Sequence, residues 1–162
     1  MLDEFRQEVG TTRRVLERVP ADKLGWKPHA RSMTLGQLAI HIATVPGRLA
    51  TLATKMDGFD VAQGNFLPDQ PKDLQQIHST FEESVKEAEG CLQGLTDEAA
   101  QSPWRLMAHG REVFVQPRAG VLRSIMLNHW YHHRGQLSVY LRLLDVPVPV
   151  IYGRSADENP FG

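Results

Sequence analysis

The 162-residue sequence contains a single cysteine, Cys91, and no strong excess of either charge. One cysteine excludes an intramolecular disulfide and any metal or iron–sulfur site built from several cysteines, which suits a reducing compartment. Lysine and arginine number 18 against 19 aspartates and glutamates, so the chain lacks the basic excess typical of nucleic-acid-binding proteins. We therefore expect no nucleic-acid partner.

Long hydrophobic runs are also missing. The first twenty residues, MLDEFRQEVGTTRRVLERVP, have no apolar stretch after Met-Leu, which argues against a signal peptide and a membrane span. The expected location is therefore cytoplasmic, without a membrane partner. No internal repeat, low-complexity tract or long linker divides the chain, so residues 1–162 are expected to form one domain.

Helical periodicity is what the chain does contain. Apolar residues recur at spacings of three and four, as in amphipathic helices, in four segments: roughly residues 2–19, 34–56, 71–92 and 118–144. Thr34 followed by Gln37 predicts a capping box at the start of the second helix, and Pro46 predicts a bend within it. The stretch WRLMAHGREVFV alternates around His109-Gly110, which favours a short β-hairpin. These patterns predict an all-α four-helix bundle with a hairpin between the third and fourth helices.

The stretch NHWYHHRGQL, residues 128–137, holds three of the seven histidines. His129 and His133 are four residues apart on a helix, so their rings point the same way and can share one ion. His41 lies on the apolar stripe of the second predicted helix and is the natural third ligand, because bundle cores build metal sites from facing helices. Three imidazoles at about 2.1 Å leave a tetrahedral ion one position for water or substrate.

A simpler interpretation treats these histidines as ordinary core residues. A lone buried histidine is more often a hydrogen-bonded packing residue than a ligand. Burying His129 and His133 without partners, however, would cost about 1–3 kcal/mol each, which favours a shared ion. His132, three residues after His129, can also converge on the same ion, and spacing alone leaves open which pair binds. Its position beside the stripe favours a supporting or surface role.

Other residues are candidates for supporting roles, and no catalytic residue is assigned. Gln136 lies one turn from His133 and is a candidate to hold that ring. The tail VPVPVIYGRSADENPFG is expected to run over the bundle, where Tyr152 and Arg154 are candidates to line a pocket. Three further expectations concern the fourth helix: Trp130 and Arg134 at a surface between helices or subunits, and Gly135 against another backbone.

The segments LGQLAIHIA and LNHWYHHRGQLSVYLRLLDVPVPVIYGRSADE closely resemble the DinB/YfiT-like superfamily. This resemblance implies a four-helix bundle, a homodimer, and a metal triad at His41, His129 and His133. The family is named for induction by DNA damage in some members, which implies a stress response and not DNA binding. Better understood relatives are thiol transferases and a mycothiol-dependent isomerase, in which the ion activates a low-molecular-weight thiol. Arg154 stands where relatives commonly have proline.

These features together predict a metal-dependent enzyme acting on a small molecule. A divalent ion held by three histidines lowers the pKa of bound water to about 7 or holds a thiol as its thiolate. No carboxylate lies between His129 and His133 to act as the general base of a hydrolase, so a thiol-dependent transferase is favoured. The alternatives are a metal-dependent hydrolase, a non-catalytic metal- or small-ligand-binding protein of a stress response, and an interaction module with core histidines. Three histidines suit Zn, Ni or Fe alike.

Overall fold

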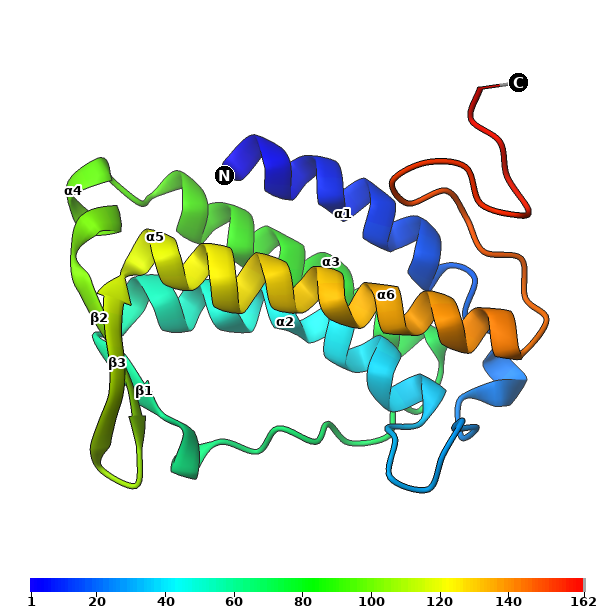
Figure 1. The fold of residues 1–162 in the computed structure, drawn as a ribbon, viewed down its shortest axis with the longest axis horizontal. Helices are drawn as coiled ribbons and strands as arrows, with labels where there is room; N and C mark the ends of the chain where they lie inside the picture. The colour runs from blue at the N-terminus through cyan, green and yellow to red at the C-terminus, as the bar shows by residue number, and fades with distance from the viewer. Residues whose placement is uncertain (162) are drawn as a thin grey trace.

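The computed structural model describes residues 1–161, which are mostly helical with a small sheet at one end (Figure 1). The helices are α1 (Leu2–Leu16), α2 (Leu35–Lys55), α3 (Leu74–Gln93), α4 (Asp97–Gln101), α5 (Arg118–Val121) and α6 (Asn128–Leu143). A π-helical segment, η3 (Leu122–Leu127), joins α5 to α6, and short 3₁₀ turns occur at η1 (Ala21–Lys23) and η2 (Val61–Gln63). The strands are β1 (Gly58–Asp60), β2 (Pro103–Ala108) and β3 (Arg111–Pro117).

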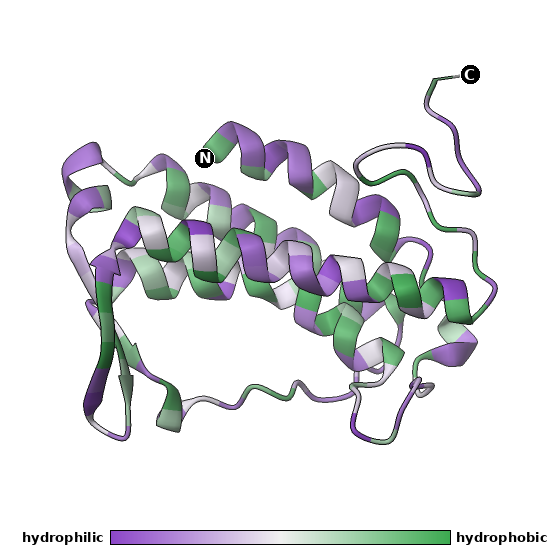
Figure 2. Ribbon diagram, viewed as in Figure 1, coloured by the Kyte–Doolittle hydropathy of each residue, from purple (hydrophilic) through white to green (hydrophobic). Residues whose placement is uncertain are grey.

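Four long helical segments lie side by side: α1, α2, α3 and the continuous α5–η3–α6 (Figure 1). Hydrophilic and hydrophobic residues alternate along them, as expected of amphipathic helices (Figure 2). Fully buried side chains from all four of these segments form the core, among them Phe5, Leu38, Ile42, Phe81 and Leu122. No helix among residues 1–161 combines the length and apolar character that a membrane span requires.

Polar caps fix where the helices begin. The capping box of α2 is confirmed: the Thr34 side chain accepts from the backbone of Gln37, and the Gln37 side chain accepts from the backbone of Thr34. Helix α3 begins at Leu74 and not at Pro71, because Asp73 caps it by accepting from the backbone of Gln76. Helix α1 ends at Leu16, three residues before the predicted end at about residue 19.

The sheet differs from the expected isolated hairpin. Strands β2 and β3 are antiparallel and turn at His109 and Gly110, which have φ angles of 52° and 73°. Strand β1 adds to β2 in parallel and makes the sheet mixed. The Asp60 carboxylate, at the end of β1, accepts from the backbone amides of both turn residues and so ties β1 to the turn. A three-residue strand is too short to show a period of two in the sequence.

The fourth long helix also differs from the prediction. Steps of three and four from His129 and His133 place Gln136 and Leu143 on the predicted inner stripe of this helix, but both are exposed. The buried face of α6 is instead centred on Trp130, Leu137 and Leu141. Successive residues are about 100° apart on a helix, so the buried face is rotated by roughly one residue from the predicted stripe. The histidines of α6 consequently lie at the edge of the core and not at its centre.

Arg134 explains part of this rotation. It was expected at a surface between helices or subunits, and it lies between α6 and α1, where its side chain is only 1% exposed and forms an ion pair of 2.6 Å with Glu8. It also donates to the hydroxyls of Thr12 and Tyr152. Because both Nη atoms have partners and the charge is paired, the guanidinium can be buried between the two helices. The expectation for Gly135 was wrong: nothing lies within 4 Å of the position a Cβ would take there.

Candidate metal centre

The structure brings His41 of α2 together with His129 and His133 of α6. One ring nitrogen from each lies within 4.8 Å of those of the other two. The Nε2 atoms of His41 and His129 are 3.1 Å apart, and the ring centroid of His133 is 4.4 Å from each of the other two centroids. Nitrogens around a tetrahedral ion with bonds of about 2.1 Å are about 3.4 Å from one another. The cluster therefore has the size and donor set of a three-histidine metal site.

Gln136 fixes which nitrogen of His133 is available. The Nδ1 of His133 lies 2.7 Å from the Oε1 of Gln136. Because an amide oxygen only accepts, Nδ1 carries the hydrogen and donates it, which leaves the lone pair of Nε2 for an ion. This pairing of a ligand histidine with an oxygen acceptor is common in metal sites. The expected contact between these two residues is thus present in the structure.

The three rings are neutral at pH 7. Burial, together with a smaller contribution from repulsion by neighbouring histidines, lowers the pKa of His41 and of His129 to about 4. Burial also lowers the pKa of His133, although its contact with Gln136 opposes the shift. Neutral imidazole is the form that binds metal ions, so the environment keeps these donors ready for a cation.

A hydrogen bond next to the histidines sets the register between the two helices. Pro46 has no N–H, so the carbonyl of Ile42, four residues earlier, loses its partner within α2. The indole Nε1 of Trp130 donates to that carbonyl at 3.0 Å. Ile42 follows His41 and Trp130 follows His129, so this bond ties the helices together one residue beyond the histidine pair.

Helix α3 supplies further hydrogen bonds to the stretch of α2 around Pro46, from the side opposite α6. The backbone N–H of Gly47 donates to the hydroxyl of Ser84 at 2.8 Å, and that hydroxyl donates to the carbonyl of Thr44. A Cβ at position 47 would lie 2.9 Å from the Ser84 backbone, so only glycine fits there. Polar groups from α3 and α6 thus replace the helix bonds disturbed by the proline.

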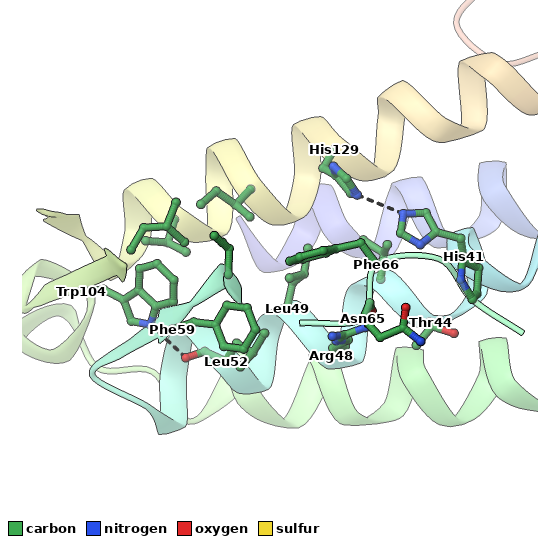
Figure 3. Close-up of a pocket in the computed structure, with 16 residues that line it drawn as sticks. His41, Thr44, Arg48, Leu49, Leu52, Phe59, Asn65, Phe66, Trp104 and His129 are labelled. Carbon is green, nitrogen blue, oxygen red and sulfur yellow. Dashed lines mark hydrogen bonds between the residues drawn. The ribbon is translucent and has the colours of Figure 1, made fainter. Parts of the chain in front are cut away.

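A cavity of about 260 Å³ adjoins the histidines (Figure 3). His41 and His129 lie at one end of it, and Leu52, Phe59 and Trp104 lie at the other. The predicted apolar stripe of α2 lines it, through His41, Val45, Leu49 and Leu52. The Trp104 indole is held in place by donating to the carbonyl of Leu52 at 3.0 Å. The candidate site is therefore polar at the histidines and apolar beyond them.

The remaining sequence candidates lie outside this cluster. His132 is exposed, with its ring centroid 4.9 Å from that of His133, and it is not part of the three-histidine group. Tyr152 does not line the cavity, because its hydroxyl contacts Arg134 and Glu8 between α1 and α6. Arg154 is exposed and does not line it either. The tail was expected to run over the bundle, and its contacts with Arg14 and Arg18 place it there, beside α1.

Several cavity residues were missed in the sequence. Arg48 lies seven residues after His41, two turns further along the same face of α2, and this spacing could have identified it. Phe59, Asn65 and Trp104 come from β1, the segment after η2, and β2. These three carry no local signal, because only the packing of the sheet against the helices brings them to the cavity.

The fold and the cluster define a helical protein with a potential metal site, and the comparisons agree with this class. The DinB family profile matches residues 1–159, and the chain belongs to that family. The uncharacterized protein YjoA of Bacillus subtilis (strain 168) is 27% identical over 149 residues, which cover 88% of this chain and 87% of YjoA.

Two crystal structures share the fold. A DinB-like protein from Bacillus cereus ATCC 10987 matches with a TM-score of 0.70 and 24% identity, over 93% of this chain and 95% of that one. The B. subtilis YjoA structure also has a TM-score of 0.70, at 21% identity over 94% of this chain and 98% of that one. At these identities the likeness concerns the fold alone.

Proposed function

We propose that this DinB-family chain is a metal-dependent transferase that joins a low-molecular-weight thiol to a small electrophile. The observation that carries the proposal is the meeting of three neutral imidazoles from two helices, two of which, His41 and His129, line one end of a cavity. His41, His129 and His133 would hold a divalent ion, either Zn, Ni or Fe. Such an ion, when bound, supplies the Lewis acidity that favours the thiolate form of a thiol at neutral pH.

The protein's own residues would position and shelter the reactants. Gln136 keeps the Nε2 of His133 directed at the site by accepting from Nδ1. The bond from Trp130 to the Ile42 carbonyl holds the two ligand-bearing helices in register. The apolar end of the cavity, at Phe59 and Trp104, would exclude water from the electrophile.

The lining of the cavity favours transfer over hydrolysis. None of the described residues that line it is an aspartate or glutamate, so no carboxylate is placed to act as the general base for water. Thiol transfer needs no such base beyond the site itself: the sulfur bonds to the electrophilic carbon, the leaving group departs with its electron pair, and the thiol proton passes to solvent. A metal-dependent hydrolase is the nearest alternative, followed by a non-catalytic metal- or ligand-binding protein.

The larger organisation belongs to the same proposal. Residues 1–162 would act as one domain, and two copies would form the homodimer that the family resemblance implies. A cytoplasmic location, with its thiol pool, would supply the co-substrate. A role in a stress response would follow if the electrophile is a toxic metabolite.

The activity is tested with protein loaded separately with Zn, Ni or Fe. Glutathione or cysteine is mixed with 1-chloro-2,4-dinitrobenzene, from which the thiol displaces chloride, and the thioether is followed by absorbance. We expect metal-dependent turnover in the wild type, loss in His41→Ala and retention in His132→Ala, which removes an exposed histidine beside the cluster. Release of nitrophenol from a nitrophenyl ester without thiol would favour the hydrolase instead. Bound metal without either reaction across a broad panel would favour the non-catalytic alternative.

A further inference from the structure

The cavity continues well beyond the histidines, and its composition indicates what it binds. Eleven of the sixteen described residues that line it are apolar or aromatic, among them Leu49, Leu52, Phe59 and Trp104. A volume of about 260 Å³ corresponds to roughly nine water molecules at about 30 Å³ each. A ligand of similar heavy-atom number would fill it. Such a ligand is larger than water and needs an apolar body.

Among the described residues that line the cavity, Arg48 is the one that carries a permanent charge. Its Nη1 lies 3.5 Å from the backbone carbonyl of Asn65, and among residues 1–161 it forms no ion pair. Glu83 and Glu87 of α3 border the neighbouring hollow that also includes Arg48, but Glu87 accepts from the hydroxyl of Thr51 instead. The guanidinium therefore keeps donors available beside the cavity.

The position of Arg48 relative to the histidines fixes where an anion would sit. His41 and Arg48 are seven residues apart on α2, which corresponds to about 10 Å along the helix. Arginine side chains on helices lean toward the N-terminus, here toward His41. Figure 3 shows Arg48 and Asn65 between the histidine end and the aromatic end of the cavity. An anionic head group placed between the histidines and Arg48 would leave its apolar tail directed at Trp104.

We propose that the cavity binds a small amphiphilic carboxylate of about eight carbons, with its head group at Arg48 and its apolar tail toward Phe59 and Trp104. A carboxylate matches the planar fork of a guanidinium through two parallel hydrogen bonds. This inference deepens the proposed function by naming the class of its small-molecule substrate. It depends on the proposed function only for the claim that the head group also faces the metal site.

The test uses octanoate and octan-1-ol, which share a chain length and differ in charge. Both are titrated by calorimetry into metal-free wild-type protein, Arg48→Gln and the control Arg31→Gln, which removes the charge of an exposed arginine outside the cavity. Leu52→Phe, which fills the apolar end, tests the location of the tail. Circular dichroism of each variant verifies that it is folded.

We expect octanoate to bind the wild type and Arg31→Gln about ten-fold more tightly than octanol, since a hydrogen bond to a charged group is worth at least that ratio. Arg48→Gln should lose this preference, and Leu52→Phe should weaken both ligands. Equal affinities for the two ligands in the wild type, or an unchanged preference in Arg48→Gln, would overturn the inference. Because the titration uses metal-free protein, octanoate binding by a chain that takes up no metal would leave this inference standing while the proposed function failed.

Discussion

Replacing Trp130 with phenylalanine tests how the two histidine-bearing helices are held in register. The change removes the indole N–H that satisfies the Ile42 carbonyl, which Pro46 has deprived of its usual partner. A buried carbonyl left without a hydrogen bond costs about 1–3 kcal/mol. The smaller ring also leaves space around a side chain that is fully buried, adding roughly 1 kcal/mol. We expect urea unfolding to show a total loss of about 2–4 kcal/mol.

The hydrogen-bond part of this loss can be separated by a double-mutant cycle with Pro46→Ala. An alanine at position 46 restores an N–H for the Ile42 carbonyl, so Trp130→Phe should cost about 1–3 kcal/mol less in that background. Trp26→Phe, the same substitution at a half-buried indole that packs on Tyr140, serves as the control. Costs of Trp130→Phe that agree within about 0.5 kcal/mol in both backgrounds would refute the reasoning.

Three further predictions concern α6 and the histidines. Gln136→Ala should weaken metal binding about 10–100-fold, measured by competition with a chromophoric chelator, because His133 loses the acceptor that orients it; an unchanged affinity would contradict this role. Gly135→Ala should raise the free energy of unfolding, measured in urea, by about 0.5–1 kcal/mol, because a Cβ at this position has no atom within 4 Å to clash with. A loss of stability would show that the position requires glycine. The metal-free protein should lose stability as pH falls from 6.5 toward 4. The reason is that His41 and His129 have pKa values of about 4 in the folded protein, so they take up protons in the unfolded chain before they do in the folded one. A free energy of unfolding that stays constant over this pH range in buffered urea titrations would contradict the prediction.

Much of the helical framework follows from local chemistry. The capping box at Thr34 and Gln37 was predictable because its hydrogen bonds connect residues only three apart. Strand β1 was not, because its pairing depends on Asp60 accepting from turn amides about fifty positions along the chain. The rotation of α6 was missed because the spacing within α6 does not show that Glu8, on another helix, pairs with Arg134 and allows its burial.

The candidate site, like the fold, could be predicted from the sequence only in part. The spacing of His129 and His133 makes a pair, and the amphipathic stripe of α2 points to His41, so the cluster was within reach of the sequence. The cavity was not, because its aromatic end is built where Trp104 of the sheet packs against Leu52 of α2. Predictions failed where a residue's environment is set by a distant partner.

The central claim is that His41, His129 and His133 bind a divalent ion, and metal content tests it most directly. Plasma mass spectrometry is applied to protein purified without an affinity tag, comparing the wild type with His133→Ala and the control His132→Ala. The account predicts about one metal ion per chain in the wild type and in His132→Ala, and little in His133→Ala. Wild-type protein without metal, even after incubation with Zn, Ni and Fe salts and dialysis, would contradict it.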